Sequence, residues 1–229
     1  MSILYVVGTP IGNLEDITLR AIRVLKEADC ILCEDTRVTK RLLERYEIKN
    51  KKLTAYNERK SGININKVIK LLEEGKNLAL VSDAGMPGIS DPGSLLLSSL
   101  RENFSPDELS IVSVPGGSAL LSALSISGFK ASDFVFLGFL PHKKGRETLF
   151  KEIAKTRRTV VLYESPHRIM KTLESLKKHI PERKIAIARE LTKIHEQFIS
   201  GKAEELLTFF NKNKEKIRGE FVVIVKSEI

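Results

Sequence analysis

Short apolar runs alternate with longer amphipathic stretches along the first half of the chain. Apolar runs at 3–7, 30–33, 52–56, 78–81 and 109–114 predict strands, and apolar residues at helical spacing predict helices at 17–25, 38–46 and 63–74. Asp16 is a suitable N-cap for the first helix, and Gly75 is a suitable stop for the third. Because strands joined through helices favour parallel pairing with right-handed crossovers, residues 1–114 are expected to form an open α/β domain with a mainly parallel sheet.

The second half of the chain continues the alternation of strands and helices. Strands are predicted at 134–137, 159–163, 184–188 and 221–225, helices at 147–154, 168–178 and 203–210, and 197–200 is expected to pair antiparallel to its neighbour. A Pro-Gly-Gly turn separates the halves, and a helix of small residues begins at Ser118. We therefore expect two α/β domains, 1–114 and 115–229, with a mixed sheet in the second and a small-molecule cleft between them.

The stretch LALVSDAGMPGISDPG, at 78–93, contains the clearest sign of a ligand site. Its apolar start is typical of a strand covered on both faces, and Gly85, Pro87, Gly88, Pro92 and Gly93 then exclude regular structure. Loops at the carboxyl ends of strands are where open α/β sheets bind ligands. A simple tight turn is the alternative, but it accounts less well for so many glycines and prolines, which suit close approach of the backbone to a ligand.

The charge of the chain is concentrated in its second half. The formal net charge is +9, yet residues 1–114 carry 16 basic and 16 acidic side chains, against 22 and 13 in residues 115–229. Seven basic residues gather within a short stretch, namely Lys143, Lys144, Arg146, Lys151, Lys155, Arg157 and Arg158. Such asymmetry favours an anionic partner such as nucleic acid, with solvated helix faces as the alternative. No aromatic residues alternate with the cluster in a way that would predict base stacking.

The sequence disfavours several other classes of protein. Its composition of 42% hydrophobic and 29% charged residues is that of an ordinary globular protein. The first apolar run is far shorter than the roughly 20 residues of a membrane span, so we expect a cytoplasmic protein without membrane contact. Cys30 and Cys33 fall inside a predicted strand without a second pair, and the histidines show no ligand spacing, so no metal site is expected. Neither a dinucleotide fingerprint nor a P-loop occurs.

Six segments together resemble a known family. They are GTPIGNLEDITLRA from Gly8, CEDTR from Cys33, VSDAGMPGISDPG from Val81, VPGGSA from Val114, YESPHR from Tyr163 and RELTKIHE from Arg189. Over nearly its whole length the chain resembles the ribosomal RNA small subunit methyltransferase I family, which has the tetrapyrrole-methylase-like fold. The resemblance implies a homodimer that binds S-adenosylmethionine between two α/β domains. It also implies methyl transfer to the ribose 2′-hydroxyl of a decoding-region cytidine in 16S ribosomal RNA. Because the basic second half carries no base-reading motif, we expect recognition of folded RNA, within the 30S subunit.

The same resemblance implies a set of cofactor contacts. They are Pro10, Ile11, Asp83, Gly85, Met86, Ile89, Ser118, Ala119, Tyr163, Leu191 and Glu220. Where tetrapyrrole methylases tend to place Gly-Asp-Pro, this chain has Gly85, Met86 and Pro87, which argues against a side-chain role at Met86. Asp83 is the candidate to recognise the cofactor instead, with capping of a turn as its alternative.

Methyl transfer to a hydroxyl also needs groups that align the reactants and remove a proton. The candidate catalytic residues stand at predicted strand ends: Asp35, Arg37, Glu164, His167 and Glu190. We hypothesise that Glu190 or His167 accepts the proton while Arg37 and Arg168 hold phosphates, and that RNA contacts Lys143, Lys144, Arg146 and Arg168. Ion pairs are the alternative role for these charges. A small-molecule tetrapyrrole methylase and a non-catalytic ribosome-binding protein remain as alternative functions.

Overall fold

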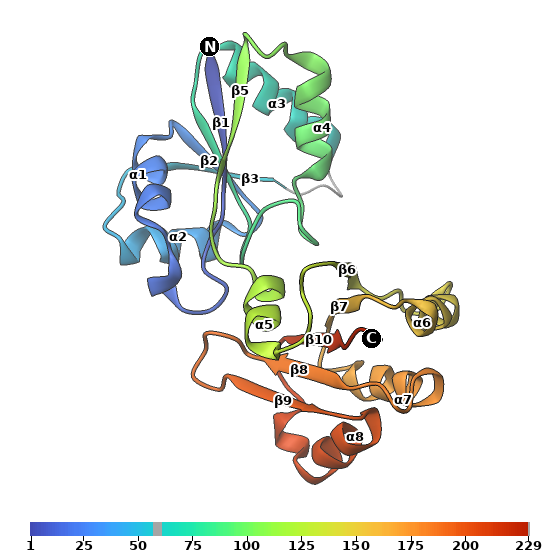
Figure 1. Cartoon of the computed structure of the whole chain (residues 1–229). Coiled ribbons are helices and arrows are strands. Elements are labelled where there is room, and N and C mark those ends of the chain that lie inside the picture. The colour runs from blue at the N-terminus through green and yellow to red at the C-terminus, as the bar shows by residue number, and fades with distance from the viewer. Residues whose placement is uncertain (57–60, 229) are drawn as a thin grey trace. The chain divides into compact units, whose positions relative to one another are not determined.

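The computed structural model describes residues 1–56 and 61–228 (Figure 1). The chain forms two units, Met1–Ser118 and Ala119–Ile229. The first unit includes the Pro-Gly-Gly turn, in which Gly116 lies directly against Gly8. No helix in the described ranges combines the length and the hydropathy that a bilayer span requires.

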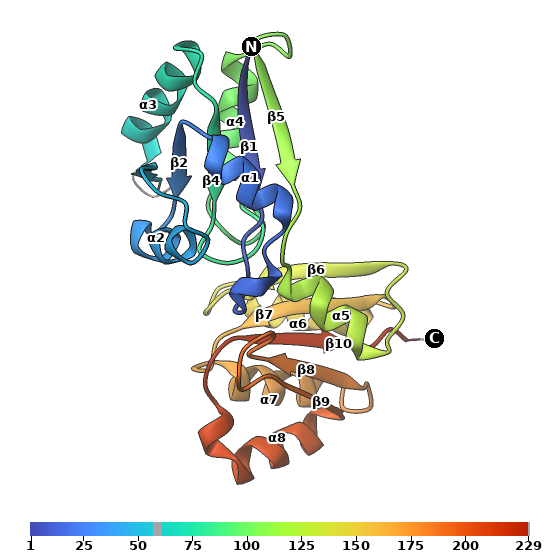
Figure 2. The same cartoon turned by 90° about the vertical axis from the view of Figure 1, so that its left-hand side faces the viewer.

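Unit 1 is built on a parallel sheet of five strands in the order β3-β2-β4-β1-β5. Its elements are β1 (Ser2–Val7), η1 (Leu14–Asp16), α1 (Leu19–Glu27), β2 (Cys30–Cys33), α2 (Thr36–Arg45), β3 (Lys52–Ala55), α3 (Ser61–Glu73), β4 (Leu78–Val81), α4 (Ser94–Asn103) and β5 (Leu109–Val114). Figure 2 shows the strands of this sheet running in one direction. The predicted parallel α/β domain is therefore confirmed.

Helices cover both faces of the unit 1 sheet (Figure 1). Apolar residues of α1 and α2 pack on one face, and those of α3 and α4 pack on the other. Helix α4 was not predicted, although its Leu96 and Leu100 stand one turn apart and are buried. The breakers Pro92 and Gly93 immediately before it obscured this short apolar stripe in the sequence.

The ends of two helices in unit 1 test the predicted capping residues. Asp16 lies in the 3₁₀ turn η1, and Thr18 caps α1 by accepting a hydrogen bond from the Ala21 amide at 3.0 Å, so the prediction of Asp16 as the cap was wrong. Threonine here has the extended backbone that an N-cap requires. Gly75 follows α3 with φ of +81°, the left-handed conformation expected of a helix stop.

Unit 2 contains a mixed sheet of five strands in the order β6-β7-β10-β8-β9. Its elements are α5 (Ala119–Ser127), β6 (Phe134–Phe139), α6 (Arg146–Lys155), β7 (Thr159–Glu164), α7 (Ile169–His179), β8 (Ile185–Arg189), β9 (Gln197–Gly201), α8 (Ala203–Lys212), η3 (Lys214–Lys216) and β10 (Phe221–Val225). Strand β9 is antiparallel to β8, as predicted, and β10 is antiparallel to both β7 and β8, which makes the sheet mixed. Strands β6, β7 and β8 consequently point the same way and end at one edge.

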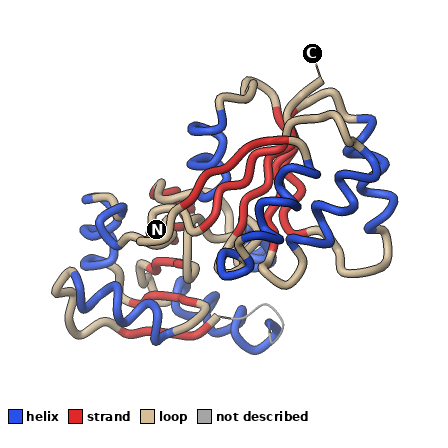
Figure 3. The backbone as a smooth tube through the Cα atoms, turned by 90° about the horizontal axis from the view of Figure 1, so that it is seen from below, coloured by secondary structure: helices blue, strands red, loops and turns tan. Residues whose placement is uncertain are grey.

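Alternate residues along these strands face different helices. Val160, Leu162, Ile185 and Val223 join a core with residues of α6, α7 and α8, whereas α5 contacts β8 and β10. Figure 3 shows helices alongside the strands. Successive side chains of a strand point to opposite faces of the sheet, and helices cover both faces here. The strands are therefore apolar at nearly every position.

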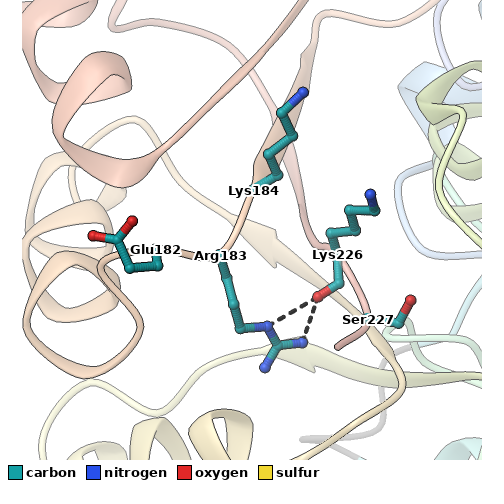
Figure 4. Close-up of a pocket in the computed structure, with 5 residues that line it drawn as sticks. All are labelled: Glu182, Arg183, Lys184, Lys226 and Ser227. Carbon is teal, nitrogen blue, oxygen red and sulfur yellow. Dashed lines mark hydrogen bonds between the residues drawn. The ribbon is translucent and has the colours of Figure 1, made fainter. Parts of the chain in front are cut away.

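A buried arginine ties together three segments at the opposite edge, where β8 begins and β10 ends. A pocket of about 280 Å³ there is lined by Glu182, Arg183, Lys184, Lys226 and Ser227 (Figure 4). The Arg183 guanidinium donates to the carbonyl oxygens of Lys226 at 2.9 Å, Ile153 at 2.9 Å and Thr156 at 3.1 Å. Arg183 thus joins the end of α6 to the sheet, because its planar fork reaches several acceptors at once.

Replacing Arg183 should weaken unit 2 more than replacing its exposed neighbour. Arg183→Lys removes most of the donors and leaves buried carbonyls unpaired, so we expect a loss of about 2–4 kcal/mol in the free energy of unfolding. Urea denaturation followed by circular dichroism measures this loss. Lys184→Ala, at an exposed position in the same pocket, is the control and should change stability by less than about 0.5 kcal/mol. Equal stability of the two variants would contradict the structural role of Arg183.

Candidate functional site

The topology of unit 1 singles out the carboxyl end of β4. The chain leaves β1 and β2 toward α1 and α2 on one face, but leaves β4 toward α4 on the other. Strand β4 lies between β1 and β2 in the sheet. The loop after β4 therefore turns away from the loops after both of its neighbours. Such divergence creates the crevice in which open α/β sheets bind ligands. The glycine- and proline-rich loop at 82–93 begins at this point.

Backbone hydrogen bonds join the loops that follow β1, β4 and β5. The Thr9 amide donates to the Gly85 carbonyl at 2.9 Å, and the Gly85 amide donates back to Thr9 at 3.2 Å. The Thr9 hydroxyl adds a bond of 3.1 Å to the Ser82 carbonyl. The Gly8 amide donates to the Val114 carbonyl at 2.9 Å. The three loops therefore form one continuous backbone surface at the carboxyl edge of the sheet.

Glycine is required where these loops touch. A Cβ atom on Gly8 would lie 2.6 Å from the Gly116 nitrogen and 2.5 Å from the Met86 sulfur. A Cβ on Gly116 would lie 2.5 Å from the Gly8 carbonyl carbon. The Met86 side chain thus packs beside Gly8. Met86, which stands where the Gly-Asp-Pro pattern has aspartate, therefore has a packing role. Gly85 adds a φ of +86°, which favours glycine for a second reason.

The other predicted contacts of unit 1 lie on the same three loops. Pro10 and Ile11 are buried after β1, Ile89 is exposed in the loop after β4, and Ser118 ends the turn after β5. A Cβ atom on Gly117 would lie 3.3 Å from the Ile11 side chain, so Ile11 packs against that turn. The structure therefore brings together residues that stand far apart in the sequence.

Two carboxylates from neighbouring strands meet at this edge. Asp83 Oδ1 accepts a hydrogen bond of 3.0 Å from the Asp35 amide, which joins the loop after β4 to the loop after β2. Asp35 caps α2 and forms an ion pair of 2.6 Å with Arg37. Hydrogen bonds from the Arg37 guanidinium and amide lower the pKa of Asp35 to about 2, whereas burial raises the pKa of Asp83. Asp83 is consequently the stronger base of the two carboxylates.

The remaining predicted residues gather at one edge of unit 2. Strands β6, β7 and β8 end there, and β10 begins there. This edge, called the loop edge below, is formed by 140–145, 164–168, 190–196 and 218–220. Tyr163 stands next to it, where its hydroxyl accepts a hydrogen bond of 3.2 Å from the Leu120 amide, just after Ala119 at the start of α5. His167 is exposed and Leu191 is buried at this edge.

Glu164 is buried at the loop edge, and both of its carboxylate oxygens accept hydrogen bonds. It is 1% exposed, and its Oε1 accepts from the Ser165 amide and from Arg168 Nε, both at 2.8 Å. Its Oε2 accepts from the Thr172 hydroxyl at 2.6 Å. A carboxylate that is enclosed and bonded through both oxygens cannot readily reach a substrate proton. A catalytic role for Glu164 stays a prediction, and these contacts favour a role in positioning the loop edge instead.

Two arginines link Glu164 to the loop after β6. Arg146 is buried, lies 3.8 Å from the Glu164 carboxylate, and donates to the Thr172 hydroxyl at 2.6 Å and to the Pro141 carbonyl at 3.3 Å. Arg168 donates to the Leu140 carbonyl at 2.7 Å. The RNA contact of Arg146 stays a prediction, which its buried and inward-bonded guanidinium disfavours. Lys143 and Lys144, on the loop that these arginines hold, are exposed.

Sequence reasoning missed Thr172, although a signal for it exists. Thr172 interrupts the apolar stripe of Ile169, Leu173 and Leu176 on the buried side of α7. A hydroxyl on an apolar stripe needs a buried partner. That requirement could have predicted a polar network beneath the loop edge.

A second carboxylate at the loop edge is held as an anion. Glu190 Oε1 accepts from Lys193 Nζ and from the Glu220 amide, each at 3.0 Å. Burial opposes ionisation, but these hydrogen bonds outweigh it and lower the pKa of Glu190. Lys193 also contacts the exposed Glu220 carboxylate at 2.8 Å. Glu190 is therefore a weaker base than an unperturbed carboxylate would be.

The cysteines pack inside unit 1. Cys30 and Cys33 are buried free thiols on β2, and burial raises the pKa of Cys33. Among the described residues, no group of three or more His, Cys, Asp and Glu side chains is placed to hold a metal ion.

Comparison with protein families identifies the class of protein. The model of the family described as Tetrapyrrole (Corrin/Porphyrin) Methylases matches residues 3–207. The chain therefore belongs to the tetrapyrrole methylase family. The crystal structure of the methyltransferase CobJ is similar with a TM-score of 0.71 and 21% identity, covering 99% of this chain and 93% of that one. Uroporphyrin-III C-methyl transferase from Thermus thermophilus, complexed with S-adenyl homocysteine, gives 0.65 and 20%, with 97% and 96% covered. These two structures support the fold.

Curated relatives narrow the assignment within that family. The protein named Ribosomal RNA small subunit methyltransferase I from Thermotoga maritima is 48% identical over 229 residues, which is 100% of both chains. The protein of the same name from Bacillus subtilis is 44% identical over 227 residues, covering 99% of this chain and 75% of that protein. The resemblance found in the sequence is thus confirmed: this is a methyltransferase of the ribosomal RNA small subunit methyltransferase I group.

The link between Asp35 and Arg37 can be tested by titration. Removing the guanidinium in Arg37→Ala should raise the pKa of Asp35 from about 2 toward its ordinary value of 3.8. Carboxyl carbon chemical shifts, followed by NMR as a function of pH, measure this change. Arg41→Ala, one turn further along α2, serves as the control and should leave the titration unchanged. If both variants titrate like the wild type, Arg37 does not hold Asp35 ionised.

Proposed function

We propose that this protein transfers a methyl group from S-adenosylmethionine to small-subunit ribosomal RNA. The carrying observation is the identity of 48% along the entire length of a relative named for that RNA. A family neighbour complexed with S-adenyl homocysteine supports the choice of methyl donor. The acceptor is the ribose 2′-hydroxyl of a decoding-region cytidine in 16S RNA, a choice that rests on the resemblance of the YESPHR and RELTKIHE segments.

The loops of unit 1 suit the cofactor. S-Adenosylmethionine needs an apolar slot for its adenine, hydrogen-bond partners for its amino-acid end and a tolerant site for its positive charge. The backbone of the loops after β1, β4 and β5 offers donors and acceptors without intervening side chains at Gly8 and Gly116. The nearby Asp83 carboxylate suits the charge and recognises the cofactor in this proposal.

The reaction is an in-line displacement. The ribose oxygen bonds to the methyl carbon while the carbon–sulfur bond breaks, S-adenosylhomocysteine leaves, and the hydroxyl proton passes to a base. Glu190 is a weak candidate for that base because its pKa is lowered. His167 takes the role in this proposal, since it is exposed at the loop edge and imidazole is the commonest general base.

Unit 2 supplies the RNA surface. The exposed Lys143 and Lys144 suit phosphate contacts, and their loop is held from below by Arg146 and Arg168. Arg168 therefore acts through this loop and not as a free phosphate ligand. A basic surface without base-stacking aromatics suits recognition of folded RNA, so the substrate is the assembled 30S subunit.

The proposal includes a cytoplasmic homodimer. Leu121 and Ile126 of α5 and Phe139 of β6 are apolar side chains exposed on unit 2. Exposed apolar side chains of this size suit association with a second copy.

A small-molecule tetrapyrrole methylase is the second candidate function. It is favoured by the structural likeness to CobJ, with its TM-score of 0.71. The surplus of 22 basic over 13 acidic residues in 115–229 favours RNA instead.

Transfer of labelled methyl groups separates the two candidates. We expect label from S-adenosylmethionine to enter 16S RNA in 30S subunits that lack the modification, and nuclease mapping should place it on the ribose of a decoding-region cytidine. Subunits that already carry the methyl group are the matched control and should accept none. Label on a porphyrin-type substrate, with none on RNA, would overturn the proposed function.

A further inference from the structure

The loop that follows β8 presents an apolar side chain at the loop edge. Ile194 is 98% exposed, more than any other large hydrophobic residue among the described residues. A single exposed aliphatic side chain is common on protein surfaces and needs no explanation by itself. What distinguishes Ile194 is the way in which the surrounding loop, 190–196, is held.

Buried and backbone groups fix both ends of this loop. Arg189 is 7% exposed, and its guanidinium donates to the His195 carbonyl at 3.1 Å and to the Arg218 carbonyl at 3.2 Å. The Lys193 amide donates to the Glu190 carbonyl at 3.0 Å, and the Glu196 amide donates to the Lys193 carbonyl at 3.0 Å. Ile194 therefore projects from a tightly bonded loop, which lowers the entropy lost when it meets a partner.

The loop also keeps a strained backbone. Glu190 has φ of +51° and Thr192 has φ of +65°, both in the left-handed region. This region is unfavourable for residues with a Cβ, and most of all for a β-branched residue such as threonine. Gly219 accommodates the turn, because a Cβ on it would lie 2.3 Å from the Glu190 carboxyl group. Strain that the surroundings maintain in this way is typical of functional sites.

The edge of the sheet that carries Ile194 also carries basic residues that suit nucleic acid. The exposed basic residues Lys143 and Lys144 follow β6, His167 follows β7, and Ile194 follows β8, so all stand at the ends of parallel strands along one edge. These basic residues all lie on the β6 and β7 side of Ile194, where they can hold the phosphates that run along the edge toward an inserted group. Proteins that unstack nucleic acid use this combination of phosphate contacts and an apolar wedge, with isoleucine and leucine among the wedges.

We propose that Ile194 is a wedge that enters the base stack beside the target nucleotide and exposes its ribose to the methyl donor. The inference rests on the proposed function. It adds a residue that recognises RNA by inserting between stacked bases and not by its charge. A ribose within folded RNA is hindered by its stacked neighbours, so displacing a base gives the 2′-hydroxyl the freedom that in-line transfer needs.

The test uses the full-length protein and 30S subunits assembled with 2-aminopurine beside the target cytidine. We expect Ile194→Ala to lower kcat/KM for methyl transfer roughly tenfold or more and to abolish the fluorescence rise that unstacking produces on binding. Ile194→Met should restore both signals, since it refills the wedge. Leu19→Ala is the matched control, because Leu19 is 86% exposed on α1 of unit 1, and it should leave both signals unchanged.

Different failures overturn different claims. Wild-type protein that transfers no methyl group to RNA would overturn the proposed function and the wedge with it. If the wild type is active and Ile194→Ala matches it in rate and fluorescence, the wedge alone is overturned. A slow Ile194→Ala variant that keeps the full fluorescence rise would also refute the wedge, since unstacking would then not depend on this side chain.

Discussion

Close backbone contact between the loops after β1, β4 and β5 is the constraint on which the site of unit 1 depends. Gly8 lies between Gly116 and the Met86 sulfur, and reciprocal hydrogen bonds join Thr9 to Gly85. A larger residue at Gly8 or Gly116 would force the loops apart, because packed backbone cannot yield as a flexible side chain can. Close backbone contact thus explains the glycines of three distant segments, and it leaves backbone groups at the surface that we propose binds the ligand.

In unit 2, buried arginines hold the loops and helix ends in place. Arg146, Arg183 and Arg189 are each buried, and each guanidinium donates to main-chain carbonyls of a neighbouring loop or helix end. Buried charges persist only when such bonds replace water. Part of the basic excess of the second half is therefore structural, and the surface offered to an anionic partner rests on exposed residues such as Lys143 and Lys144.

The sequence allowed accurate prediction where periodicity and topology decide the outcome. The strands, their parallel or mixed pairing and the loop after β4 follow from apolar runs and from glycine and proline positions. The direction in which a charged side chain points could not be predicted from such patterns. The sequence predicts Glu164 as a catalytic residue and Arg146 as an RNA contact, and their burial is visible only in the folded chain, where both bond to Thr172 of α7. Thr172 was the one available clue, as a hydroxyl on an apolar stripe.

The central claim is that the glycine-lined loops of unit 1 bind the methyl donor. Isothermal titration calorimetry with S-adenosylmethionine tests it most directly on Gly116→Ala, since the added Cβ would meet Gly8 at 2.5 Å. Gly128→Ala is the control for the strain of replacing a glycine outside these loops, because its φ of +65° disfavours alanine although a Cβ there meets nothing within 4 Å. We predict that Gly116→Ala binds S-adenosylmethionine roughly tenfold more weakly or worse, whereas Gly128→Ala binds it like the wild type. Wild-type affinity in a folded Gly116→Ala protein would contradict it.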